Sequence, residues 1–171
     1  IDCTANRQPM GVFAAITPFN FPPMVPLWFL PYAIGTGNTF VLKTSEQVPM
    51  SWMRMMELLD QTGLPKGVVN MVHGAKDVVT GLCEHPDVEG VSFVGSTKVA
   101  EIVYELSAKH GKRVQALGGA KNHITIMPDA AREQSVANAT ASVFGCAGQR
   151  CLAGSVVVAV GDAYDWVKTG I

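Results

Sequence analysis

The chain has 171 residues, of which 48% are hydrophobic and 16% are charged, and its formal net charge is −1 at pH 7. This length and apolar content suit one domain, or a large part of one, with a substantial buried core. The lysines and arginines are scattered, so no basic stripe predicts binding to nucleic acid. The charged share lies below the roughly 25% typical of soluble proteins, which predicts that other polypeptide covers part of the surface.

No segment predicts a membrane span or a metal site. The richest apolar stretch, residues 21–34, is interrupted by prolines and is shorter than the roughly 20 residues that cross a bilayer. No basic start precedes an apolar run, so no secretory signal is predicted. The four cysteines include no Cys-x-x-Cys pair and the four histidines are scattered. We therefore expect reduced thiols and a cytoplasmic location, or the mitochondrial matrix in a eukaryote. A start at Ile1 is expected of a fragment or a processed chain.

Short β-rich runs alternate with helical segments along the chain. Each run is apolar and ends at polar, Gly or Pro residues, which indicates buried strands. This alternation predicts βαβ units, that is, an α/β fold with a Rossmann-like parallel sheet flanked by helices. The predicted strands are 11–17, 39–43, 68–72, 91–94, 113–117, 123–127 and 155–160, and the predicted helices are 48–61, 76–83, 97–109 and 131–144.

Ligands in such sheets bind beyond the carboxyl ends of the strands. Three polar clusters follow predicted strands, namely residues 17–20, 43–46 and 95–96. The dinucleotide fingerprint Gly-x-Gly-x-x-Gly is missing, so a dinucleotide would use another loop. We predict that the turn at Ser96 is this loop, because the predicted helix after it would offer free N–H groups to a pyrophosphate. A plain Ser N-cap is the alternative interpretation.

Two segments resemble catalytic motifs of the aldehyde dehydrogenase superfamily. Residues 144–151, FGCAGQRC, resemble the nucleophile motif, which implies that Cys151 is the catalytic nucleophile. We expect Cys146 to be a small packing or channel-wall residue. Residues 17–22, TPFNFP, resemble the turn whose Asn helps to form the oxyanion hole, which here is Asn20. A buried core cysteine and a turn-capping asparagine are the structural alternatives.

The resemblance extends to the cofactor site and implies NAD. Lys43 and Glu46 would hold the adenosine ribose, and the Glu46 carboxylate would repel a 2′-phosphate, which favours NAD over NADP. A solvated i, i+3 pair is the alternative for these two residues, and core packing is the alternative for Phe19. The implied cofactor-binding residues are Thr17, Phe19, Lys43, Glu46, Gln47, Ser96 and Gly118.

One departure from the family pattern concerns the general base. Hydrolytic members carry Glu at the head of a Glu-Leu-Gly-Gly-Lys segment, where this chain has Ala116. In this detail and in the sequence around Arg150, the chain resembles the coenzyme A-acylating, methylmalonate-semialdehyde dehydrogenase branch. Water gains about 10²–10⁴-fold from a positioned base, whereas a thiol with a pKa near 8.5 is partly ionised unaided. Arg150 could favour the Cys151 thiolate and hold a substrate carboxylate.

The resemblance thus implies an NAD-dependent enzyme that oxidises malonate or methylmalonate semialdehyde to an acyl-CoA, through a thioester on Cys151, in valine and inositol catabolism. It also implies a homo-oligomer. Residues 1–120 are the predicted NAD-binding domain, without its N-terminal part, and residues 121–171 the predicted start of the catalytic domain. Three alternatives stay open: a hydrolytic aldehyde dehydrogenase, a nucleotide-binding module without turnover, and a cysteine hydrolase with a histidine base.

Overall fold

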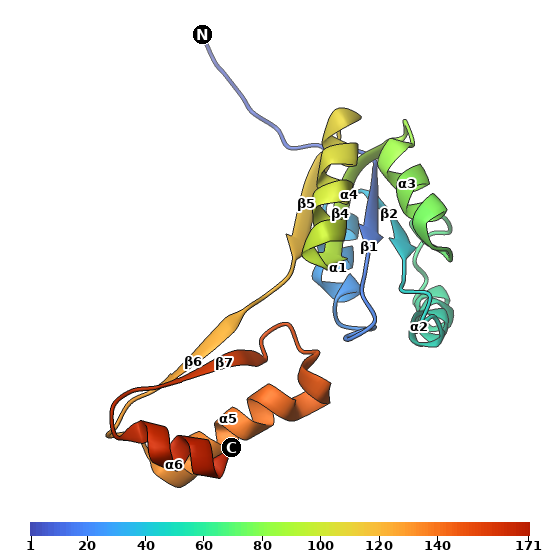
Figure 1. The fold of residues 1–171 in the computed structure, drawn as a ribbon. Coiled ribbons are helices and arrows are strands. Elements are labelled where there is room, and N and C mark those ends of the chain that lie inside the picture. Colours follow the sequence, from blue (N-terminus) through green and yellow to red (C-terminus); the bar gives the residue numbers. More distant parts are fainter. The chain divides into compact units, whose positions relative to one another are not determined.

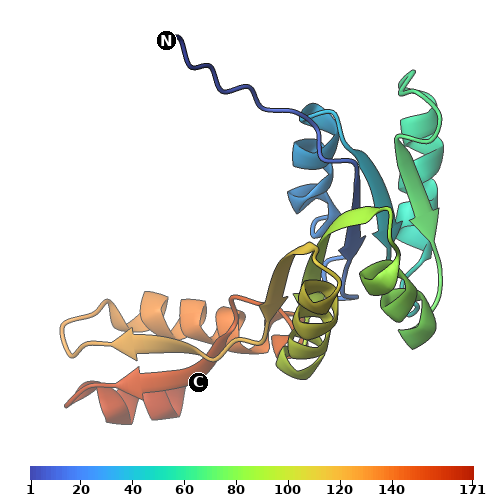
Figure 2. The ribbon, with the colours of Figure 1, turned by 90° about the horizontal axis from the view of Figure 1, so that it is seen from above.

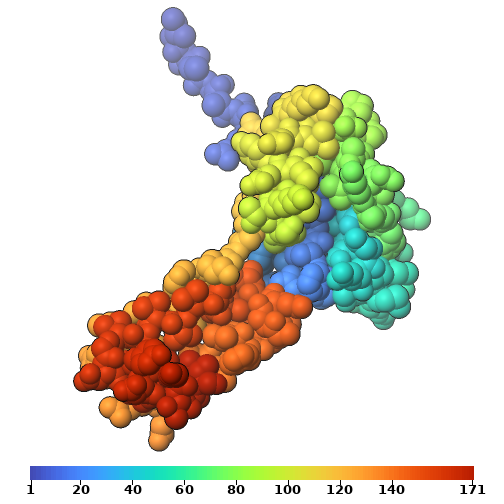
Figure 3. Space-filling view, in the orientation of Figure 1, coloured from blue at the N-terminus to red at the C-terminus, as the bar shows by residue number.

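The computed structural model describes residues 1–171. The chain divides into two compact units, Ile1–Gly118 (unit 1) and Gly119–Ile171 (unit 2). This division lies close to the domain boundary expected after residue 120. Residues 1–10 are exposed and extend from unit 1, as Figure 3 shows. No helix is long and apolar enough to cross a membrane.

Unit 1 is built on a five-stranded sheet with the order β3-β2-β1-β4-β5, in which every neighbouring pair is parallel (Figure 1). The α/β, Rossmann-like prediction is therefore confirmed. The strands are β1 (Val12–Ile16), β2 (Thr39–Lys43), β3 (Val69–Val72), β4 (Val88–Gly95) and β5 (Arg113–Gly118). The helices are η1 (Pro26–Trp28), α1 (Leu30–Gly35), α2 (Met50–Asp60), α3 (Lys76–Glu84) and α4 (Thr97–Lys109).

Both faces of this sheet are covered, because successive side chains of a strand point to opposite sides. Ala14 and Ile16 of β1 pack in a core with residues of α3 and α4. Ala15, between them, packs on the other face with residues of α1 and α2. Figure 2 shows the two helix layers on either side of the sheet. A central strand buried on both faces explains the uninterrupted apolar run at residues 12–16.

The strand order reverses beside β1. The chain runs outward from β1 through β2 to β3 and then returns to place β4 on the other side of β1. Ile16 is paired with Lys43 of β2 and with Phe93 of β4, so these three strands end at one edge. The backbone N–H of Thr17 continues the pattern with a 3.1 Å hydrogen bond to the Lys43 carbonyl. The three predicted polar clusters therefore do follow neighbouring strand ends, at a topological switch point.

Unit 2 has a small parallel sheet of two strands, with a core in which Ile126 packs with Ala139, Ala163 and Val167. Its elements are β6 (Asn122–Ile126), α5 (Arg132–Phe144), η2 (Gly145–Gly148), β7 (Gly154–Ala159) and α6 (Ala163–Gly170). Every predicted strand and helix is present, with ends shifted by a few residues at most. The sequence reasoning missed η1, α1, η2 and α6.

The prolines between β1 and β2 explain why the sequence analysis did not predict η1 and α1. Pro26 opens η1 and Pro31 stands in the first turn of α1, where a missing N–H costs nothing because it would have no intrahelical partner. These prolines therefore begin helices, although in the sequence they looked like breaks. The missed α6 has only eight residues, too few for a clear helical period.

Candidate active site

Cys151 lies in a turn of unit 2, between η2 and β7, and its side chain is exposed. Two hydrogen bonds shape this segment, from Gln149 N–H to the Cys146 carbonyl at 3.0 Å and from Ala153 N–H to the Arg150 carbonyl at 3.0 Å. The thiol thus stands on a turn that follows the long helix α5 and precedes a strand. This is the accessibility that a nucleophile needs.

A side chain of β6 holds this turn. The Asn122 amide donates to the Cys151 carbonyl at 2.7 Å and to the Ala153 carbonyl at 3.0 Å. One strand-borne amide therefore fixes the backbone on both sides of Leu152. Sequence reasoning assigned no role to Asn122.

The backbone before Cys151 is strained. Cys146 and Ala147 have φ values of 55° and 52°, in the left-handed region that residues with a Cβ avoid at a cost of about 1–2 kcal/mol each. Strain of this kind clusters at functional sites, where the surrounding structure enforces it. Cys146, which was predicted to be a small packing or channel-wall residue, has an exposed side chain in this chain and a left-handed backbone conformation.

Arg150 folds back over Gly145. A Cβ built at Gly145 would lie 2.9 Å from Cζ and 3.0 Å from the two terminal nitrogens of the Arg150 guanidinium. These atoms are the far end of a flexible side chain, so a Cβ here would displace the guanidinium and not the backbone. The guanidinium lies beside Gly145, and Arg150 directly precedes the nucleophile in sequence.

The turn that carries Asn20 belongs to unit 1 and joins β1 to η1. Thr17 is buried at its start, Asn20 is half-buried, and Phe19 is 39% exposed. A hydrogen bond of 3.2 Å from Val25 N–H to the Phe21 carbonyl closes its far end. The partial exposure of Phe19 disfavours the core-packing alternative for this ring.

Lys43 and Glu46 form an ion pair between β2 and α2, with Nζ 2.8 Å from Oε2. The lysine side chain is 6% exposed and the glutamate side chain 59%. The Lys43 hydrogen bond is the main reason that the pKa of Glu46 lies below its ordinary value of 4.5. Gln47, next in sequence, is exposed and its backbone N–H bonds to Ser45 Oγ at 3.3 Å. A buried cation thus holds a charged carboxylate open to solvent.

Ser96 occupies the N-cap position of α4, but its hydroxyl makes no capping hydrogen bond. Its carbonyl accepts the Ala100 N–H at 2.9 Å, as the first helical bond. Side-chain capping therefore does not account for serine at this position. The first N–H groups of the 13-residue helix have no intrahelical acceptor and suit an anion.

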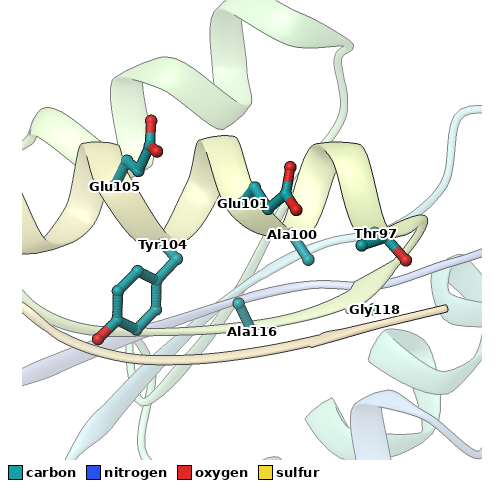
Figure 4. A pocket seen from close by; sticks show the side chains of 7 residues that line it. All are labelled: Thr97, Ala100, Glu101, Tyr104, Glu105, Ala116 and Gly118. Carbon is teal, nitrogen blue, oxygen red and sulfur yellow. The ribbon is translucent and has the colours of Figure 1, made fainter.

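Gly118 lies under the first turn of α4. A Cβ at this position would come 2.6 Å from the Ala100 Cβ and 2.9 Å from the Thr97 Cα, so any other residue would push the helix away. Figure 4 shows Gly118 in a hollow of about 280 Å³ between α4 and β5. Close packing is a sufficient structural reason for this glycine, and contact with a cofactor is a separate prediction.

Ala116 lines the same hollow, beside Glu101 and Glu105 of α4 (Figure 4). Its methyl group packs against the core that α3 and α4 cover. Leu117, one residue on, is 43% exposed and lines a hollow on the other face of the sheet. Neither Ala116 nor Leu117 has a carboxylate. The usual general base is therefore missing, whichever of the two residues faces the substrate.

The fold and these motifs define a class. The family model described as aldehyde dehydrogenase family matches residues 2–170, and the chain belongs to that family. A curated relative, malonate-semialdehyde dehydrogenase 3 of Geobacillus kaustophilus, is 60% identical over 165 residues, which are 96% of this chain and 34% of the relative. The chain spans about a third of the length of the curated relatives it matches.

Two solved structures support the same placement. Methylmalonate-semialdehyde dehydrogenase from Oceanimonas doudoroffii has a TM-score of 0.92 and 53% identity, over 95% of this chain and 33% of that chain. A Sinorhizobium meliloti protein described as a methylmalonate-semialdehyde dehydrogenase, and solved with NAD, has a TM-score of 0.94 and 47% identity, over 96% of this chain and 34% of that chain. The resemblance read from the motifs is thereby confirmed for the family, and the similar proteins carry the names malonate- and methylmalonate-semialdehyde dehydrogenase.

Proposed function

We propose that this chain supplies the dinucleotide-binding sheet and the nucleophile of an NAD-dependent, coenzyme A-acylating dehydrogenase of malonate or methylmalonate semialdehyde. The observation that carries the proposal is Cys151, an exposed thiol on a turn held by Asn122, in a chain of the aldehyde dehydrogenase family. The names of the relatives agree with the substrate class. The proposal concerns the whole protein.

The residues at the sheet edge fit NAD. The exposed Glu46 carboxylate could accept hydrogen bonds from both ribose hydroxyls, while buried Lys43 keeps it charged. The first turn of α4, after Ser96, offers N–H groups to the pyrophosphate. Four other residues complete the proposed site. Thr17 and Phe19 follow β1, Gln47 follows β2, and Gly118 ends β5. When bound, NAD would accept the hydride that the substrate releases.

The chain's own residues would perform the acyl transfer. The Cys151 thiolate attacks the aldehyde carbon and forms a thiohemiacetal, whose oxygen carries negative charge. The Asn20 amide and the Cys151 backbone N–H donate hydrogen bonds to that oxygen, and losing one such donor typically costs about 10²–10³ in rate. Loss of hydride then leaves a thioester on Cys151.

Coenzyme A is the proposed acyl acceptor. No carboxylate stands at Ala116 or at Leu117 to activate water. A thiol needs this help less, since its pKa near 8.5 leaves part of it ionised at neutral pH. Arg150, whose guanidinium lies beside Gly145, is the proposed partner of the substrate carboxylate, because a guanidinium can bind a carboxylate through two hydrogen bonds.

The test is NADH formation by the whole protein, with methylmalonate or malonate semialdehyde as substrate and with or without coenzyme A. We expect steady turnover only with coenzyme A, and an acyl-CoA as product. Equal turnover without any thiol would contradict the acylating part of the proposal, and free acid as the sole product would support a hydrolytic enzyme.

We further propose that the whole protein is a homo-oligomer that acts in the cytoplasm, or in the mitochondrial matrix of a eukaryote. The low charged share of 16% supports burial of surface by other polypeptide. Light scattering on the whole protein measures the mass directly, and a monomer would contradict the first part.

A further inference from the structure

The indole of Trp52 joins two segments of the proposed site. Trp52 lies in the first turn of α2, and its side chain is fully buried. Its Nε1–H donates a hydrogen bond of 2.5 Å to the Pro22 carbonyl, two residues after Asn20. The helix that follows the Lys43–Glu46 pair is thus tied to the turn that carries the proposed oxyanion donor.

The turn needs such a tie because its sequence is rich in proline. Pro18, Pro22 and Pro23 have no backbone N–H and cannot donate hydrogen bonds to fix their own segment. The backbone bonds that define the ends of the segment involve Thr17 and Val25. The Trp52 indole acts between these ends, at the Pro22 carbonyl.

Burial alone does not explain this hydrogen bond. Buried indoles usually find an acceptor, but Trp166 of α6 has a buried Nε1 without any partner in this chain. The Trp52 ring packs among apolar residues of the core below α1 and α2, where Phe would fill most of the same space. What only tryptophan adds is the donor that reaches Pro22.

We propose that Trp52 is a positioning residue that sets the placement of Asn20 relative to the cofactor end of the sheet. This inference rests on the proposed function, in which the Asn20 amide donates to the oxyanion. Through its hydrogen bond, a residue of the core would control a donor at the reacting centre. Displacing a catalytic group by about 1 Å can cost about 10²-fold in rate.

The experiment compares Trp52→Phe with Trp166→Phe in the whole protein. Both variants lose an indole N–H and keep an aromatic ring, but within this chain only the Trp52 N–H donates a hydrogen bond. We expect kcat of Trp52→Phe to fall by about 10- to 10²-fold, with KM for NAD within about two-fold of wild type. We expect Trp166→Phe to retain wild-type kcat. A kcat for Trp52→Phe equal to that of Trp166→Phe would overturn the proposal.

Two further measurements separate this role from general stability and from the proposed function. If Trp52 acts through Asn20, Trp52→Phe has no additional effect in an Asn20→Ala background, whereas an equal effect in both backgrounds would overturn the proposal. Hydrogen exchange at the amides of residues 19–25 should accelerate in Trp52→Phe more than in β1, and unchanged exchange would also overturn it. If Asn20→Ala alone keeps full activity, the proposed oxyanion role of Asn20 is wrong. The hydrogen-exchange result then still tests whether the Trp52–Pro22 hydrogen bond fixes the turn.

Discussion

The Nζ of Lys43 and the Oε2 of Glu46 lie 2.8 Å apart, but the two side chains differ about ten-fold in exposure, at 6% and 59%. The lysine is therefore a buried support and the glutamate an exposed acceptor. Another i, i+3 ion pair, between Arg54 and Glu57 on α2, has both side chains exposed. The comparison supports a binding role for Glu46.

Glu46→Gln should weaken NAD binding by about 10-fold or more, because hydrogen bonds to a charged group contribute about 1.5–3 kcal/mol. Calorimetric titration of the whole protein with NAD measures the change. The matched control is Glu57→Gln, which breaks the exposed pair with Arg54 and should leave NAD affinity unchanged. Equal losses in the two variants would argue against the ribose contact.

The same carboxylate predicts a pH dependence. The pKa of Glu46 in the folded chain lies below 4.5, chiefly because of the hydrogen bond from Lys43. The carboxylate is thus charged at every pH above 4.5, and its contribution to NAD binding and to stability is lost only as pH falls below 4.5 through the lowered pKa. Glu46→Gln should lack this acid-side loss. NAD affinities measured from about pH 7 down to about pH 3, which is below the ordinary carboxyl pKa, would reveal the difference.

Cys151→Ala should abolish NADH formation and leave NAD affinity close to wild type, because the thiol reacts with the substrate and the cofactor contacts lie in unit 1. Cys146→Ala is the control, since it removes the other exposed thiol of the same segment and keeps the nucleophile. It should retain most of the activity. The assignment of the nucleophile would be wrong if the effects of the two substitutions were reversed.

A carboxylate introduced near the end of β5 should shift the acyl acceptor from coenzyme A towards water. We expect the gain in Ala116→Glu, because hydrolytic members of the family carry Glu at this position, and Glu101 and Glu105, which line the same hollow, would raise its carboxyl pKa towards the range of a general base. The measurement is the rate of free-acid formation without coenzyme A, which a positioned base raises by about 10²–10⁴-fold. A gain in Leu117→Glu and none in Ala116→Glu would contradict the base position that the motif implies.

From the buried thiol of Cys83 we predict that the free energy of unfolding decreases at alkaline pH. Cys83 is fully buried in the core of unit 1, and burial is the main reason that the pKa of its thiol lies above the ordinary value of 9.0. The neutral thiol is favoured in the folded chain, so its contribution is complete below pH 9.0 and declines as pH rises above that value, where the unfolded thiol ionises. The free energy of unfolding of Cys83→Ala should fall less steeply above pH 9.0 than that of wild type.

Much of unit 1 could be predicted because its strands are buried on both faces and end at clear polar boundaries. The run at residues 11–17 is one example, and its end correctly predicted that Thr17 and Lys43 would lie at one edge. Helix α4 was predicted at its observed bounds, because its apolar residues follow a 3.6-residue period after the turn at Ser96.

What could not be predicted depends on side-chain contacts between distant segments. Nothing in the sequence links Trp52 to Pro22, thirty positions away, or the Asn122 amide to the carbonyls around Cys151. The motif comparison placed the missing base at Ala116, but it could not predict that this side chain packs with the core under α3 and α4, while Leu117 lines a hollow on the other face of β5. Motifs indicated which residues belong to the candidate site, and tertiary contacts determine how each one is held.

The left-handed backbone at Cys146 and Ala147 costs stability in the segment that precedes the nucleophile. Glycine at either position would relieve about 1–2 kcal/mol of strain. It would also give the turn more freedom when Cys151 must meet its substrate in one orientation. A more stable segment and a more precisely oriented thiol would therefore need different residues at these two positions.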